Sequence, residues 1–178
     1  MDKKRHLTLI TTMVAASMVL ELLPIKLFFP LLPYLTFDIG EIPIFFLAFY
    51  AGIKDGVLAS IALTVLLFMF GTFVPIGPLM KYAAVLSGIT GAWAGMKIRE
   101  SLYMSFALST ILRIAVMTIV NYVLIEYFMP GFLKFLPYYI TFLTPMMTVL
   151  VLTALFNIIQ NAVSFFPAYA VWMRFRTA

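Results

Sequence analysis

Three side-chain amides in the apolar C-terminal part of the chain are the residues best suited to recognise a polar ligand. Asn157, Gln160 and Asn161 stand at positions i, i+3 and i+4, a spacing that places all three on one face of a helix. Each amide offers both a donor and an acceptor, so this face can read hydrogen bonds. The alternative is contact between helices, because membrane helices also use Asn and Gln to hold one another together.

Other polar residues interrupt apolar stretches, where an unpaired amide or charge costs a few kcal/mol. Asn121 precedes Tyr122 near the end of one stretch, and Lys81 lies about one turn inside another. Lys81 either reaches a ligand or extends its long side chain to water, and the second behaviour is the commoner. Arg113 lies deeper, and we expect a structural role in which it pairs with a glutamate, Glu21 or Glu126, or bonds a backbone carbonyl.

The segment from Tyr34 to Pro43 is too apolar for an ordinary solvated connection. Its apolar and polar residues alternate as they do in a short extended segment. We expect it to fold over a pocket as a lid, and packing against the ends of helices is the alternative. The candidate ligand contacts in it are Tyr34, Leu35, Thr36 and Phe37.

The elements that must position these residues are membrane helices. The chain has 178 residues, of which 64% are hydrophobic and 11% charged, and this balance excludes a soluble domain. A membrane helix needs about 20 mostly apolar residues. The sequence predicts one all-α membrane domain over residues 1–178, with six transmembrane helices at approximately Leu7–Leu23, Glu41–Ile53, Gly56–Phe70, Pro78–Met96, Ser101–Phe128 and Thr144–Met173.

The first two predicted helices are unusual. The first could be a cleavable signal peptide, but it has no small-residue cleavage site before Pro24, and we expect a mature helix. The second has only about a dozen apolar residues, or about 18 Å of helix, so we expect it to cross incompletely or to lean on its neighbours.

Basic residues in the connections predict the orientation, because cytoplasmic loops carry the excess of Lys and Arg. Eight fall on one side and two, Lys26 and Lys134, on the other; the eight are Lys3, Lys4, Arg5, Lys54, Lys97, Arg99, Arg174 and Arg176. Both termini are therefore predicted to be cytoplasmic, in a multi-pass protein of the cell membrane.

Several kinds of chemistry are excluded. There is no cysteine, and the single histidine, His6, lies in the charged N-terminal tail, so neither a metal site nor thiol catalysis is expected. The basic residues are too scattered for a nucleic-acid surface. No P-loop motif is present, so any work driven by ATP must come from a partner. No serine has an evident partner base, and we do not expect an enzyme.

Small residues mark the faces on which helices approach closely. Gly91 and Gly95 form a G-x-x-x-G pattern, which predicts a helix-packing face. A second stripe in the first helix either packs inside the fold or docks a partner subunit; it consists of Thr11, Thr12, Ala15 and Ala16.

In its arrangement the chain resembles the substrate-binding S components of energy-coupling factor (ECF) vitamin transporters, and most of all the riboflavin-binding type. Four segments carry the resemblance: the loop from Tyr34 to Pro43, Ala51–Gly52, Met117–Tyr122 and Phe156–Asn161. It departs from the family at Thr36 and Gln160, where lysine is common.

The resemblance implies a six-helix subunit of a prokaryotic cytoplasmic membrane that binds riboflavin and needs no cofactor. Asn121 and Asn157 would pair with the polar edge of the isoalloxazine ring, and the loop would cap the pocket. Transport would require a membrane coupling protein and two cytoplasmic ATPases. Three alternatives stay open: an S component for another vitamin or small aromatic metabolite, a structural membrane subunit, and an intramembrane enzyme.

Overall fold

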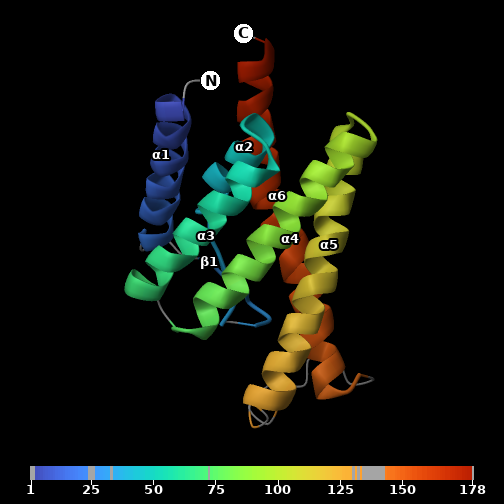
Figure 1. The fold of residues 1–178 in the computed structure, drawn as a ribbon. Coiled ribbons are helices and arrows are strands. Elements are labelled where there is room, and N and C mark those ends of the chain that lie inside the picture. Colours follow the sequence, from blue (N-terminus) through green and yellow to red (C-terminus); the bar gives the residue numbers. More distant parts are fainter. Residues whose placement is uncertain are drawn as a thin grey trace.

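The computed structural model describes residues 3–23, 27–32, 34–71, 73–129, 131, 133 and 143–177. Six α-helices form the body of the protein (Figure 1). Their bounds are α1 Lys3–Leu22, α2 Ile42–Tyr50, α3 Ile53–Phe70, α4 Ile76–Ile98, α5 Leu102–Val123 and α6 Pro145–Thr177, and a π-helical turn, η1 Leu124–Phe128, continues α5.

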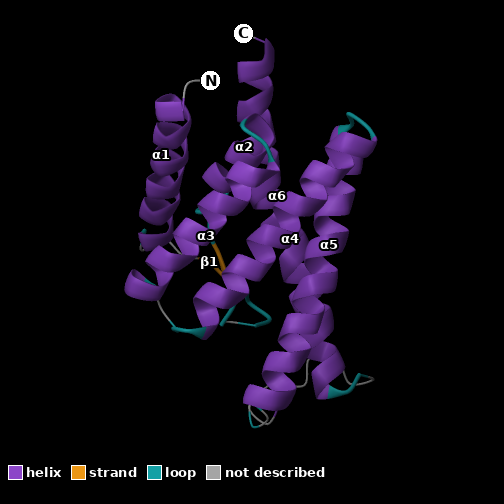
Figure 2. Cartoon of the chain, viewed as in Figure 1, coloured by secondary structure: helices purple, strands orange, loops and turns teal. Residues whose placement is uncertain are grey.

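The loop between α1 and α2 contains the strands of the described chain, a short hairpin drawn in orange in Figure 2. Strand β1 (Leu27–Phe28) pairs antiparallel with β2 (Thr36–Phe37), with Leu27 opposite Phe37. The prediction of an extended segment within this loop is confirmed. Lys26 and Lys134, the two outer-loop cations counted above, lie outside the described residues.

The predicted helix positions are confirmed, although α1 begins at Lys3 instead of the predicted Leu7, and α2 and α6 also end at other residues than predicted. Helix α2 has nine residues, fewer than the predicted range, with Pro43 in its first turn. It stops because Gly52 has a φ of 106°, a conformation that glycine adopts without steric cost. Helix α6 continues past the predicted Met173 to Thr177.

Helices α4 and α5 lie side by side over most of their length (Figure 1). A Cβ atom on Gly91 would collide with the backbone carbonyl of Leu108, and one on Gly95 with the backbone of Ser105. The Ser105 hydroxyl donates to the carbonyl of Ala92 over 2.8 Å. The prediction that this glycine face packs a helix is confirmed.

The start of α1 and the end of α6 lie at the same end of the molecule (Figure 1). An even number of spans requires this arrangement. Three helical segments of the described chain are long and apolar enough to cross a membrane by length and composition alone: Ile53–Phe70, Leu102–Phe128 and Pro145–Arg176. Of these, α6 is the most deeply buried in the fold.

Two apolar clusters form the core. The larger joins α1, α2, α3, α4 and α6, with Phe45, Ile89 and Phe165 at its centre. The smaller packs the α1–α2 loop against η1 and α6 through Phe29, Leu32, Ile125, Val149, Leu152 and Phe156.

Candidate ligand-binding site

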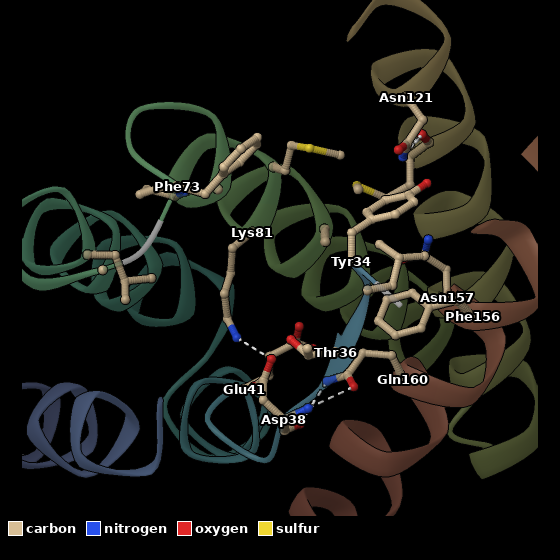
Figure 3. Close-up of a pocket in the computed structure, with 18 of the residues that line it drawn as sticks. Tyr34, Thr36, Asp38, Glu41, Phe73, Lys81, Asn121, Phe156, Asn157 and Gln160 are labelled. Carbon is tan, nitrogen blue, oxygen red and sulfur yellow. Dashed lines mark hydrogen bonds and ion pairs between the residues drawn. The ribbon is translucent and has the colours of Figure 1, made fainter. Parts of the chain in front are cut away.

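A cavity of about 570 Å³ opens among the helices and the α1–α2 loop (Figure 3). This volume falls in the range of small-molecule sites, which are mostly apolar with a few polar groups. Its apolar wall includes Leu67, Phe70, Phe73, Met80, Met117, Leu124, Ile125 and Phe156. Its polar wall consists of Glu21, Tyr34, Thr36, Asp38, Glu41, Lys81, Arg113, Asn121, Asn157 and Gln160.

Two asparagines reach the cavity from neighbouring helices, α5 and α6 (Figure 3). Asn121 and Asn157 each donate one amide hydrogen to the carbonyl one turn back, Met117 at 2.7 Å and Thr153 at 2.8 Å. An amide nitrogen carries two hydrogens, so each Asn keeps a second donor. Both side chains are almost fully buried, which makes them expensive to leave unpaired and effective in ligand recognition.

Arg113 and Glu41 form a buried ion pair beside Asn157. The guanidinium donates twice to the carboxylate, over 2.6 and 2.9 Å, and its Nε donates to Asn157 Oδ1 over 3.1 Å. Arg113 forms an ion pair, as expected for a structural role, but the expected partners Glu21 and Glu126 are wrong. The carboxylate that pairs with Arg113 is that of Glu41. Two fixed donors on one carboxylate leave the guanidinium little freedom, so the Asn157 amide is held in one orientation.

Gln160 ties the loop to α6. Its Nε2 donates to the carbonyl of Asp38 over 2.8 Å, and its Oε1 accepts from the Asp38 backbone N–H over 3.3 Å. The same nitrogen lies 3.2 Å from the Ser164 hydroxyl. Gln160 lines the cavity, yet much of its hydrogen-bonding capacity holds the loop in place.

Lys81 points toward the α1–α2 loop (Figure 3). Its Nζ donates to Asp38 Oδ2 over 2.7 Å and also pairs with the carboxylate of Glu21. Only 14% of the side chain is exposed. The expectation that Lys81 extends to water is therefore wrong, because two carboxylates from other elements meet it at the cavity wall.

The loop residues divide between cavity and core. Tyr34, Leu35 and Thr36 line the cavity. Phe37 instead packs against other rings, stacking on Phe156 with centroids 4.8 Å apart. Burial of its phenol, partly offset by a hydrogen bond with Thr153, raises the pKa of Tyr34 to about 12, so its hydroxyl remains protonated at physiological pH.

Asn161 lies outside the cavity. Its Oδ1 is 3.0 Å from the Ser109 hydroxyl, and its Nδ2 donates to Thr110 Oγ1 over 2.9 Å. The amide face of α6 therefore divides: Asn157 and Gln160 turn to the cavity, and Asn161 binds α6 to α5.

The stripe of small residues on α1 lies on the outside of the protein. Thr11, Thr12 and Ala15 are exposed and Ala16 is partly exposed. Both threonine hydroxyls bond to carbonyls of their own helix. The exposed surface of the stripe is therefore uncharged.

Three acidic cavity residues were not among the residues predicted for the site: Glu21, Asp38 and Glu41. A signal for them existed in the two cations within helices, since a cation buried in a membrane protein needs an anionic partner. The chain has only seven acidic residues to choose from. Among the described residues, no group of His, Asp and Glu is arranged to hold a metal ion.

A solved structure and a curated sequence that match this chain agree with each other, while no family model matches the chain. The structure superimposes on one described as the S component of a bacterial ECF transporter, with a TM-score of 0.80, 24% identity and coverage of 99% of this chain and 98% of the other. The chain has the S-component fold. This fold confirms the prediction of a six-helix, all-α membrane protein.

The sequence is also similar to the riboflavin transporter RibU of Staphylococcus aureus (strain TCH60). The two are 28% identical over 125 residues, which cover 68% of this chain and 66% of the relative. Both matches support the predicted resemblance to S components, and the sequence match supports the riboflavin type. The fold and the long apolar helices of the described chain together indicate a multi-pass membrane protein.

Proposed function

We propose that the protein is the substrate-binding subunit of an ATP-driven vitamin importer and that it binds riboflavin in the cavity. The observation that carries the proposal is the pair of buried amides, Asn121 and Asn157, on the wall of a largely apolar cavity in an S-component fold. The similarity to a riboflavin transporter supports the choice of ligand.

The chemistry of the cavity suits a flavin. The flavin ring system has carbonyl and ring-nitrogen acceptors beside an N–H donor, and an Asn amide offers both functions. Phe156 and Tyr34 supply aromatic surface beside Asn157 (Figure 3). The ion pair of Arg113 with Glu41 fixes the Asn157 amide before the ligand arrives, which lowers the entropy cost of binding.

Delivery into the cell requires partners in this proposal. The sequence lacks a P-loop, so a membrane coupling subunit and two cytoplasmic ATPases would supply the energy. The exposed stripe on α1 formed by Thr11, Thr12, Ala15 and Ala16 is the proposed docking face. Small side chains suit close packing of helices within a bilayer.

Fluorescence titration of the detergent-purified protein with riboflavin tests the ligand. We expect saturable quenching with about one flavin per chain. Asn157→Ala should weaken binding about 10- to 100-fold, because a buried hydrogen bond to the ligand would be lost. Asn161→Ala is the matched control: it removes an amide one turn away, outside the cavity, and should lower thermal stability while leaving the affinity unchanged.

Either of two results would contradict the proposal. The first is the absence of riboflavin binding by wild-type protein that gives a cooperative melting transition, which would direct the search to another vitamin or aromatic metabolite. The second is an equal loss of affinity in Asn157→Ala and Asn161→Ala, which would show that the amides act only through stability.

A further inference from the structure

The wall of the cavity carries more negative than positive charge. Glu21, Asp38 and Glu41 face it with three carboxylates, whereas Lys81 and Arg113 contribute two cations. The described wall therefore has one net negative formal charge. These residues come from α1, the α1–α2 loop, α4 and α5, so the imbalance belongs to the assembled cavity and not to any one element.

Both cations of the described wall are already neutralised. Arg113 makes two hydrogen bonds to Glu41, and both side chains are at most 3% exposed. Lys81 donates to Asp38 over 2.7 Å and contacts Glu21 as well. Lys81 is shared between Asp38 and Glu21, so these two carboxylates exceed their one cation by one charge, and Glu21 contributes to that excess.

Glu21 is held where a ligand would feel its charge. Its side chain is only 10% exposed, and the carboxylate packs against Gly40, where an added Cβ would come within 2.7 Å of Glu21 Oε1. Charges act over longer distances in a poorly hydrated cavity than in water, since the effective dielectric constant is nearer 20 than 80. A phosphate on a bound ligand would meet this charge with no unpaired cation of the described wall to offset it.

We infer that the cavity selects an uncharged ligand over its phosphorylated form, and that Glu21 is a residue that determines this specificity. The inference rests on the proposed binding of a flavin. It deepens that proposal by naming the neutral vitamin, and not the flavin nucleotide, as the class of ligand. The selection is electrostatic and does not depend on the size of the added group.

Three ligands separate charge from size: riboflavin, riboflavin 5′-phosphate and the neutral ester riboflavin 5′-acetate. In titrations of the wild-type protein, the phosphate should bind at least tenfold more weakly than riboflavin. The acetate should bind with an affinity within a few-fold of that of riboflavin. Equal weakening by acetate and phosphate would overturn the inference in favour of a steric limit. Failure of riboflavin itself to bind would instead contradict the proposed function.

Glu21→Gln should reduce the ratio of the affinities for riboflavin and for its phosphate about tenfold. This is the effect of one charge at about 10 Å in a medium of that dielectric constant. Glu126→Gln is the control, because Glu126 is exposed on η1 and does not line the cavity. The inference would be overturned if this affinity ratio were unchanged in Glu21→Gln, or if it fell equally in the control.

Riboflavin affinity of each variant reports whether the cavity is intact. If Glu21→Gln does not fold, Asp38→Asn removes a wall charge while keeping an oxygen for the Gly40 N–H, which Asp38 Oδ1 accepts over 3.0 Å. We expect the same reduction of the affinity ratio in Asp38→Asn. An unchanged ratio in an Asp38→Asn variant that binds riboflavin would overturn the inference.

Discussion

Arg113 is the side chain whose removal should affect this protein most at the residue scale. It is only 2% exposed, and Glu41, its partner, is equally inaccessible. Arg113→Met would leave the Glu41 carboxylate buried without a counter-charge, which costs about 3–5 kcal/mol. We expect the melting temperature in detergent to fall by several degrees.

The double variant Arg113→Met with Glu41→Leu is the control for that prediction. Replacing both partners of a buried ion pair by apolar residues is often neutral, so most of the lost stability should return. Riboflavin affinity should stay reduced in both variants, because the Nε that holds Asn157 Oδ1 is missing. A single variant as stable as the wild type would show that Glu41 finds another partner.

At this scale the sequence predicted types of residue better than their partners. The amides Asn121 and Asn157 reach the cavity as predicted for ligand contacts, although nothing yet tests those contacts. Helical spacing could not distinguish Asn157 from Asn161, since both lie on one face and only the position of α5 separates them. Likewise, no local pattern joins Arg113 to Glu41, 72 positions apart in the chain.

At the scale of elements, the contact of α4 with α5 depends on the absence of side chains. Gly91→Ala would normally stabilise a helix by up to about 1 kcal/mol. Here the new methyl group would collide with the Leu108 carbonyl, so we expect the helices to separate and the melting temperature to fall. Gly131→Ala is the control, because no atom lies within 4 Å of the Cβ that it adds.

A Gly91→Ala variant as stable as the Gly131→Ala control would contradict close packing at that point. The prediction of this face from the sequence succeeded because the G-x-x-x-G pattern is local. Helix ends were harder to predict: the end of α2 depends on the backbone conformation of Gly52, which apolar composition does not show.

At the scale of the whole molecule, the cationic ends of the helices lie together. Lys4 and Arg5 lie in the first turn of α1, Lys97 lies in the last turn of α4 and Arg99 directly after it, and Arg174 lies in the last turn of α6. The chain order places these ends on one side, which agrees with the predicted cytoplasmic face. The sequence predicted this arrangement without any knowledge of helix packing, because the charges of the loops and the number of helices are enough to predict on which side the ends lie.

Assembly with a coupling subunit is also a property of the whole molecule, and α1 offers the test. Ala15→Trp would add a large ring to the exposed stripe, and we expect it to prevent copurification with a coexpressed coupling subunit and two ATPases while riboflavin binding is retained. Ile119→Trp is the control, since Ile119 is 64% exposed on α5. Loss of assembly in both variants, or in neither, would contradict docking through α1.

Asp38 joins several polar attachments of the α1–α2 loop in one residue, beside the apolar packing of Phe29, Leu32 and Phe37. Its backbone exchanges two hydrogen bonds with Gln160, and its carboxylate accepts from Lys81 and from the Gly40 N–H. Contacts that share one residue break together, so the loop is expected to release as a cooperative unit. Ligand escape would then follow single-exponential kinetics, with a residence time that reflects the rate of this one opening step more than the strength of the ligand's own contacts.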